Sequence, residues 1–304
     1  MAIVNPEVLA SINAQFKKDW NDAFNAVKTN HEDFTMVIPS SSASNDYGWI
    51  GSLGDIREWL GDRVVNDLSV HTYSIKNKDF ELTHGVKKTD IEDDNLGTAQ
   101  YIFRGHGKKF GEFPGKMSWN ILKDGFTHVC YDGQYFFDTD HPVYPNSDGT
   151  GVADTVSNIQ SGAGASPLWV LIDTSQILLP VVWQDRKKPV FTAMTKLDDE
   201  TVFTANNFRW GTDSRGNSGL SLWQLAYASK EPLTRENADA NILAMEAFKA
   251  DGGEKLGITV THCLVSPENY TAAVEVFENE YIDSVAKTKN PYYGKIKVIK
   301  SPTW

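Results

Sequence analysis

The clearest hydrophobic pattern lies near the start of the chain, where an apolar side chain recurs at every fourth residue. These positions are Val8, Ile12, Phe16, Trp20 and Phe24. Such a spacing places them on one face of an α-helix. Asn5 can cap the first turn, and Pro6 suits the first helical position. The pattern predicts a helix with one apolar face, and that face needs a partner to pack against.

Residues 69–88 alternate between apolar and polar positions on either side of the short polar stretch KNKD. Alternation of this kind is typical of β-strands, and a polar stretch between two alternating runs is typical of a turn. We therefore predict a long two-stranded hairpin over 69–88. Because a lone hairpin is marginally stable in water, it must lie on the core or reach onto another subunit.

A helical region is predicted at 89–122. Thr89 and Glu92 have the T-x-x-E spacing of a capping box, which predicts a helix start at Thr89. The rest of the region keeps its apolar positions but also carries Gly105, Gly107, Gly111, Pro114 and Gly115. Relative to alanine, glycine costs roughly 1 kcal/mol and an interior proline roughly 3 kcal/mol in a helix. We therefore predict a kinked or interrupted helix pair.

The second half of the chain mixes strand and helix patterns. Residues 167–194 are rich in strand-forming residues, with prolines as breaks. Thr234 is placed to cap a helix that stops at Gly252 and Gly253, and Ser266 is placed to cap a further helix. The fold class that these patterns predict is a mixed α and β fold.

Composition and charge narrow the class of partner. The chain has 304 residues, 40% of them hydrophobic, which is enough for a large core. Its formal net charge is -11, so its long-range field repels a polyanion, and we do not expect a dedicated nucleic-acid reader. The tail after Asp283 holds five lysines and no acid. We interpret it as an edge strand with Lys295 and Lys297 facing solvent, and a basic arm for an acidic partner is the alternative.

The cysteines and the first residues indicate the cellular compartment in which the protein is made. Cys130 and Cys263 lie far apart and in no metal-binding spacing, which predicts two buried thiols in a reducing compartment. The first residues show neither a basic leader nor a cleavage site, and no apolar run has the length of a membrane span. We expect a protein made in a cytoplasm, with no membrane partner.

The densest candidate chemistry is the D-T-D-H sequence within 130–146. In an extended strand Asp138 and Asp140 face the same side, so their carboxylates could share a metal ion with His141. A metal site needs further ligands and residues that orient them, and the neighbouring sequence supplies none in a metal-type spacing. The flanking Asp-Gly, His-Pro and Tyr-Pro pairs are typical of turns. We predict a structural turn; a metal-dependent hydrolase using Asp138, Asp140 and His141 is the alternative.

Other catalytic patterns do not fit the chain. Serine-hydrolase, dinucleotide-binding, phosphate-loop and zinc-protease motifs each fail on spacing or residue type. We therefore expect no catalytic residue, no cofactor and no metal.

Six stretches, taken in order, resemble one family. They are NDYGWIGSLGDIREWLGDR, YSIKNKDFELTHGVKKTDIEDDNLG, LKDGFTHVCYDGQYFFDTDHPVYPN, WVLIDTS, RWGTDSRGNSGLSLWQLAYASKEPLT and LVSPE. In content and order they are similar to the major head subunits of Mu-like bacteriophages, over nearly the whole chain. The resemblance implies an α+β, HK97-like phage capsid fold with an N-terminal arm, an extended β-hairpin loop, a peripheral domain with a spine helix, and an axial domain.

The resemblance also implies a division of the chain. Residues 1–68 would form the N-terminal arm and the start of the peripheral domain, 69–88 the extended loop, and 89–125 the spine-helix region. Residues 126–255 would be mainly the axial domain, and 256–304 would return to the peripheral domain.

The function implied is that of a major capsid protein and not of an enzyme. Copies would assemble into hexameric and pentameric capsomers and then into an icosahedral shell around the genome. The expected partners are other copies of the chain, a scaffold or protease, a portal and a decoration protein, with at most weak, non-specific genome contact. The expected location is the virion, after assembly in the bacterial host cytoplasm. A cellular nanocompartment shell of the same fold is a further alternative, which neighbouring genes would distinguish.

Two features of shell proteins can be sought in the sequence. Interfaces between subunits need aromatic anchors, and the nine tryptophans, including Trp49 and Trp59, are candidates. Some HK97-like shells also carry a Lys to Asn isopeptide bond between subunits. Lys76, Asn77 and Lys78 lie at the predicted hairpin tip, but a turn alone explains polar residues there. We expect no such cross-link.

Overall fold

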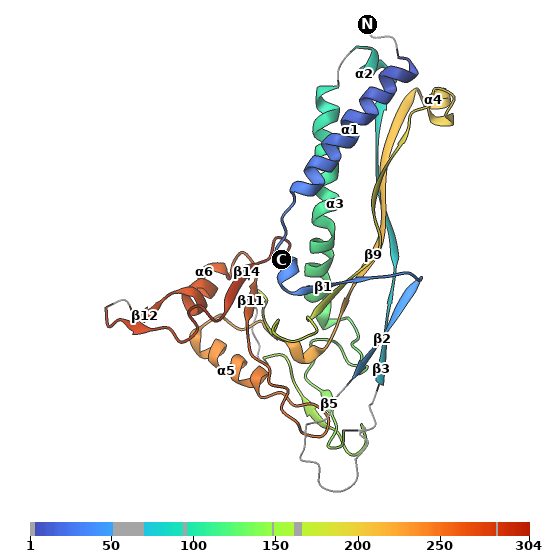
Figure 1. The fold of residues 1–304 in the computed structure, drawn as a ribbon. Coiled ribbons are helices and arrows are strands. Elements are labelled where there is room, and N and C mark those ends of the chain that lie inside the picture. Colours follow the sequence, from blue (N-terminus) through green and yellow to red (C-terminus); the bar gives the residue numbers. More distant parts are fainter. Residues whose placement is uncertain (1–3, 51–69, 94–95, 148, 161–165, 284) are drawn as a thin grey trace.

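The computed structural model describes residues 4–50, 70–93, 96–147, 149–160, 166–283 and 285–304. Figure 1 shows an elongated molecule with two parts. In the part that we name the arm, helices α1 (Pro6–Ala26) and α3 (Gly97–Lys123) lie beside a sheet of long strands. In the part that we name the lobe, shorter strands carry α5 (Arg235–Glu246) and α6 (Tyr270–Ala273).

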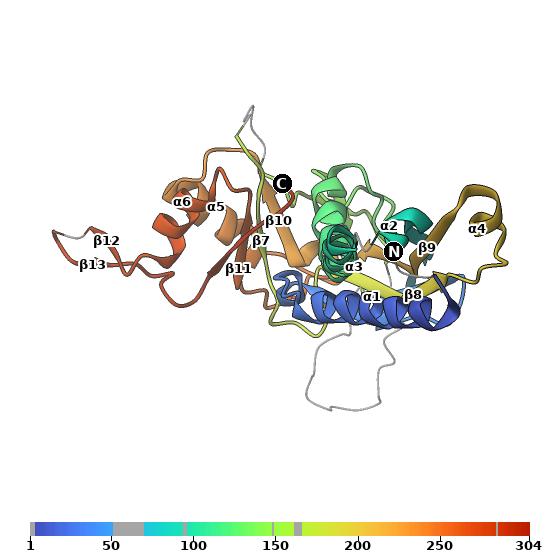
Figure 2. The ribbon, with the colours of Figure 1, turned by 90° about the horizontal axis from the view of Figure 1, so that it is seen from above.

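The arm sheet has the strand order β1-β8-β9-β4. Its strands are β1 (Thr35–Pro39), β8 (Val181–Met194), β9 (Asn207–Leu220) and β4 (Lys78–Lys87). The two 14-residue strands β8 and β9 pair antiparallel, and the short helix α4 (Glu200–Ala205) joins them at the far end of the arm (Figure 1). Helix α1 packs against α3, and in Figure 2, seen from above, α3 is viewed nearly end-on with α1 beside it.

The lobe sheet has the strand order β10-β7-β11-β14. Its strands are β10 (Ala226–Ser229), β7 (Trp169–Ile172), β11 (His262–Val265) and β14 (Lys297–Lys300). Three two-stranded ribbons complete the described strands: β2 (Ser44–Ile50) with β3 (Val70–Lys76), β5 (His141–Val143) with β6 (Asp154–Val156), and β12 (Tyr281–Asp283) with β13 (Thr288–Lys289). The lobe sheet is the centre of the largest buried apolar cluster in the described chain.

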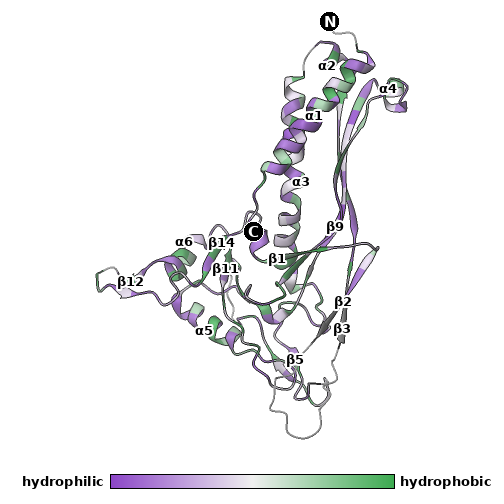
Figure 3. Cartoon of the chain, viewed as in Figure 1, coloured by the Kyte–Doolittle hydropathy of each residue, from purple (hydrophilic) through white to green (hydrophobic). Residues whose placement is uncertain are grey.

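The predicted first helix is confirmed. The Asn5 side chain accepts a hydrogen bond from the backbone N–H of Val8 at 2.8 Å, as an N-cap does. Phe16 is buried and stacks on Phe103 of α3, with ring centroids 4.4 Å apart. Figure 3 shows hydrophilic and hydrophobic residues along both α1 and α3, as expected of helices with one buried side.

The predicted interruption of the second helical region is wrong, because α3 is one helix of 27 residues with Pro114 inside it. Its glycines allow a close approach between helices. A Cβ on Gly107 would lie 2.2 Å from the carbonyl oxygen of Trp20, and one on Gly111 would lie 2.7 Å from the Val27 side chain. The close packing that these glycines permit offsets their low helix propensity, so tertiary contacts override the local preference.

The predicted pairing within the 69–88 hairpin is also wrong. Both strands form, but β3 pairs with β2 and β4 pairs with β9. Only Asn77 separates β3 from β4, and one residue cannot close a hairpin, for which the shortest common loop has about two. The alternation therefore predicted the strands correctly and their partners incorrectly.

The helix caps gave mixed results. Thr234 caps α5 and accepts a hydrogen bond from the N–H of Asn237, as predicted, but α5 ends at Glu246, before the glycine pair. The capping box at Thr89 is wrong, because the short helix α2 (Lys88–Glu92) begins one residue earlier and has no side-chain cap. Asn269, not Ser266, is the residue before α6.

The strand pairing cuts across the expected limits of the domains. Strands β8 and β9 fall within 126–255 but belong to the arm sheet, whereas β11 and β14 fall within 256–304 and pair in the same sheet as β7. The limit at 255 therefore divides one sheet.

The predicted edge strand is confirmed: β14 is at the sheet edge, and Lys295 and Lys297 are exposed. The names peripheral for the arm and axial for the lobe stay a prediction.

The tryptophans mostly belong to the interior of the subunit. Six of them are buried, namely Trp20, Trp119, Trp169, Trp183, Trp210 and Trp223. Their use as anchors between subunits is therefore wrong, because folding of the single chain already covers them. The side chains of Trp49 and Trp59 lie outside the described residues.

Candidate functional site

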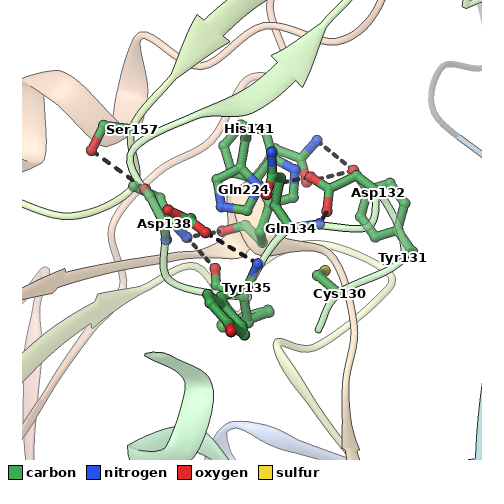
Figure 4. A network of polar contacts seen from close by, with 12 residues as sticks. Cys130, Tyr131, Asp132, Gln134, Tyr135, Asp138, His141, Ser157 and Gln224 are labelled. Atoms are coloured by element: carbon green, nitrogen blue, oxygen red, sulfur yellow. Dashed lines mark hydrogen bonds and ion pairs between the residues drawn. The ribbon is translucent and has the colours of Figure 1, made fainter. Parts of the chain in front are cut away.

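The segment around His141 is a packed turn on the lobe (Figure 4). The imidazole is fully buried, and its Nδ1 lies 2.6 Å from Oδ2 of Asp132. The ring also stacks on Trp223, with centroids 4.1 Å apart and planes 10° apart. The sequence predicts a turn at Asp132-Gly133 but does not indicate Asp132 as the partner of His141.

The two other predicted site residues have structural or solvent-exposed positions. The Asp138 carboxylate accepts hydrogen bonds from the backbone N–H groups of Tyr135 and Thr139, at 3.2 and 2.8 Å. Asp140 is exposed, and desolvation and the neighbouring Asp138 raise its pKa from the usual value. These contacts agree with the predicted turn, since an Asp that accepts local backbone N–H groups stabilises a turn.

The cavity beside this turn is small. It has a volume of about 50 Å³ and is lined by Tyr131, Asp132, Pro142, Val143, Tyr144, Gln224, Lys249 and Asp251. Ligand pockets usually have volumes of about 300 Å³ or more. Within the described part of the chain, no three His, Cys, Asp or Glu side chains are arranged to hold a metal ion. That Asp138, Asp140 and His141 bind no metal stays a prediction.

Both thiols are buried and free, as predicted. Burial raises the pKa of Cys130 and of Cys263 well above that of an exposed thiol. A thiol in that state is a poor nucleophile at neutral pH. In the described residues no helix is long and apolar enough to span a membrane.

The arm exposes apolar side chains that folding of one chain does not cover. Phe203 of α4 is 87% exposed and Tyr101 of α3 is 74% exposed. A groove of about 430 Å³ runs between β4 and α3, with Phe80, Leu82 and Phe113 in its lining. Exposed apolar surface of this kind is typical of contact sites between proteins. The arm, rather than the D-T-D-H turn, is the candidate functional surface.

Asn77 closes a buried network at the base of the arm. Its side-chain N–H groups donate to Oγ of Ser40 and to the carbonyl oxygen of Ser42, both at 2.9 Å. Its side-chain oxygen accepts a hydrogen bond from Gln184 at 2.7 Å. The network joins the start of β4 to β8 and to the chain that enters β2, which fixes the direction of the β2–β3 ribbon.

The fold defines the class of protein. The chain is similar to a subunit of the procapsid of bacteriophage JBD30, with a TM-score of 0.84 and 41% identity over 99% of this chain and 100% of that one. A subunit of the JBD30 capsid matches with a TM-score of 0.77 and 30% identity over 99% of both chains. The fold is therefore the HK97-like fold of phage capsid proteins, as the sequence resemblance implied.

The sequence comparisons name the family. The family model for the Mu-like prophage major head subunit gpT matches residues 9–304. The major capsid protein of Escherichia phage Mu is 38% identical over 98% of both chains, and a Mu-like prophage FluMu major head subunit of Haemophilus influenzae is 39% identical over 92% of both. This chain belongs to the Mu-like major head subunit family. It is a structural component of the phage capsid, so the predictions of a head subunit and of a virion location are confirmed.

Proposed function

We propose that copies of this chain assemble into pentameric and hexameric capsomers and then into a closed icosahedral shell around a phage genome. The similarity of 99% of the chain to a procapsid subunit, with a TM-score of 0.84, carries this proposal. The exposed apolar surface of the arm also supports it, because closed assemblies need complementary patches on each subunit. The arm would supply those contacts, and the lobe would lie at the capsomer centre.

We also propose the partners of assembly. A scaffold or protease and a portal would act with the subunit in the bacterial host cytoplasm. One neighbouring structure is the JBD30 capsid decorated with minor capsid protein trimers. By analogy, a decoration protein would bind the outer face of this shell.

The proposed function involves no catalysis and no cofactor. The small cavity at the His141 turn and the structural hydrogen bonds of Asp138 support this. Metal analysis of purified protein, together with Asp140→Ala, tests it. We expect less than one equivalent of metal and unchanged thermal stability; a stoichiometric metal that Asp140→Ala removes would restore the hydrolase hypothesis.

We propose that mature shells carry no isopeptide bond at Lys76, Asn77 or Lys78. Asn77 is 4% exposed and its amide is held in the network with Ser40 and Gln184, so a lysine of another subunit cannot reach it. Denaturing gel electrophoresis of mature particles should show only monomers. A ladder of covalent oligomers would contradict the proposal.

The assembly proposal is tested first with purified protein expressed alone. Native mass and negative-stain microscopy should show pentamers, hexamers, tubes or shells. If the protein stays monomeric, co-expression with its scaffold is the second measurement. A monomer under both conditions would overturn the proposal.

A further inference from the structure

Helix α3 differs in charge from the rest of the molecule. It contains five basic residues and one acidic residue, Glu112, and so has a formal net charge of +4. Because the whole chain has a net charge of -11, the residues outside α3 carry -15. Helix α3 is therefore, with the lysine-rich tail after Asp283, one of two regions of this acidic subunit that attract an anion locally.

Three of these lysines form a line on one side of the helix. Lys109, Lys116 and Lys123 are exposed and lie seven residues apart, which is close to two helical turns. At 1.5 Å per residue they span about 21 Å. The other two cations are engaged: Arg104 pairs with Asp19 at 2.8 Å, and Lys108 lies 3.6 Å from Glu112. No ion pair joins the three aligned lysines to an acid within the described ranges.

A fourth lysine lies beside the middle of this line. Lys28, in the segment after α1, and Lys116 line one groove of about 430 Å³. Thr29, Asn30 and Thr303 are polar members of the same groove, Glu112 is its acidic member, and Trp119 and Pro302 are apolar members. Ammonium and hydroxyl groups together are typical of contacts to phosphate oxygens.

We propose that Lys109, Lys116 and Lys123, with Lys28, form a surface that contacts the phosphate backbone of double-stranded DNA. This face of α3 is therefore turned to the interior of the shell, and the inference rests on the proposed genome-enclosing function. Evenly spaced cations on a straight helix suit a continuous polyanion.

The expected strength is low, which suits a genome that leaves the shell. Binding in which the four lysines neutralise four phosphates has a slope of log K against log salt of about -3.6, so affinity falls roughly 150-fold between 50 and 200 mM salt. Contact of this kind is independent of DNA sequence.

The test measures DNA binding by purified subunits that have not assembled. Fluorescence anisotropy of a 30-base-pair duplex is recorded across that salt range for the wild type and for the triple variant K109Q/K116Q/K123Q. The matched control is K287Q/K289Q/K295Q, which removes three exposed lysines from the C-terminal tail. We expect the α3 variant to make the slope about 2.7 less negative and the control to leave it unchanged.

Several outcomes would overturn the inference. One is wild-type protein that does not bind the duplex at 50 mM salt. Another is an α3 variant whose slope of log K against log salt equals that of the wild type. A third is an equal change of this slope in both triple variants. Shell assembly of each protein is scored separately by negative stain. Loss of assembly in the α3 variant with an unchanged DNA slope would assign the lysines to subunit contacts, whereas failure of the wild type to assemble under any condition would count against the proposed function.

Discussion

The lobe and the arm each bury a histidine, and the two histidines differ in their surroundings. In the lobe, His141 has Asp132 at 2.6 Å and a tryptophan ring stacked on its own. In the arm, His106 is 1% exposed between α3 and β4, and neither of its ring nitrogens has a hydrogen-bond partner among the described residues. The Nδ1 of His141 thus has a partner, whereas its Nε2 has none among the described residues. Among the described residues, the arm has a smaller buried apolar cluster than the lobe and more buried polar side-chain atoms without a hydrogen-bond partner.

The largest effect should come from breaking the core of the lobe with Trp223→Ala. Trp223 is 1% exposed and contacts both His141 and Phe248. The loss of its buried surface should lower the free energy of unfolding by about 4 kcal/mol. Urea unfolding followed by circular dichroism measures this. Tyr135→Ala is the control, since Tyr135 is 46% exposed, and an equal loss in both variants would contradict a self-contained lobe.

Acid should weaken the arm through His106. Burial, followed by the nearby His84 and Lys109, lowers its pKa to about 4. An unfolded histidine has a pKa of about 6.5, so the unfolded chain binds more protons between these two values. The contribution of neutral His106 to the free energy of unfolding is thus fully present above about pH 6.5. It is lost, by up to about 3 kcal/mol, as the pH falls towards 4.

Unfolding measured from pH 7.5 to 4 in wild-type protein and in His106→Phe tests this prediction. In the variant the free energy of unfolding should fall less steeply with decreasing pH, because phenylalanine does not titrate. His128→Gln, which changes an exposed histidine, should keep the wild-type slope. The same acid sensitivity in wild type and His106→Phe would show that the arm histidine is not the cause.

The contact between α1 and α3 should be sensitive to a single methyl group. Gly107→Ala should cost about 1–3 kcal/mol, because the new Cβ would meet the carbonyl oxygen of Trp20 and force the helices apart. Gly105→Ala is the matched control on the same helix, with no atom within 4 Å of its Cβ. It should raise stability by up to about 1 kcal/mol. Thermal unfolding compares the two; similar shifts would exclude a close helix contact.

The smallest effect on stability is expected at the tip of the arm. Phe203→Ser should change the free energy of unfolding by less than about 0.5 kcal/mol, because the ring is 87% exposed. Val202→Ser, one residue earlier at a buried position, should cost more. Under assembly conditions Phe203→Ser should lower the yield of shells in sedimentation. A normal yield would remove Phe203 from the contact surface.

Local patterns in the sequence predicted the elements better than their partners. The four-residue spacing at α1, the caps at Asn5 and Thr234, and the edge strand β14 depend on nearby residues, and all were confirmed. The pairing of β4 with β9 joins residues more than 100 positions apart, such as Lys87 and Asn207, and alternation carries no information about such a partner.

The candidate site shows the same limit. The sequence indicated a turn at Asp138 and Asp140, because turn residues act locally. It could not show that His141 would bind Asp132, or that glycines in α3 would allow close packing against α1, since both depend on tertiary contacts. The identity of Asn77 as a buried junction was missed for the same reason: its polar neighbours in sequence are typical of an exposed loop.

The Asn77 network lies near one end of the long strand β8. Strand β8 runs ten residues beyond Gln184 to Met194, which at about 3.3 Å per residue is roughly 33 Å. A rotation of about 5° at Gln184 would move the far end of the strand by about 3 Å, which is most of the separation of two atoms in contact. The hydrogen-bonding side chains of Asn77, Ser40 and Gln184 thus limit how far the end of the arm can swing relative to the lobe.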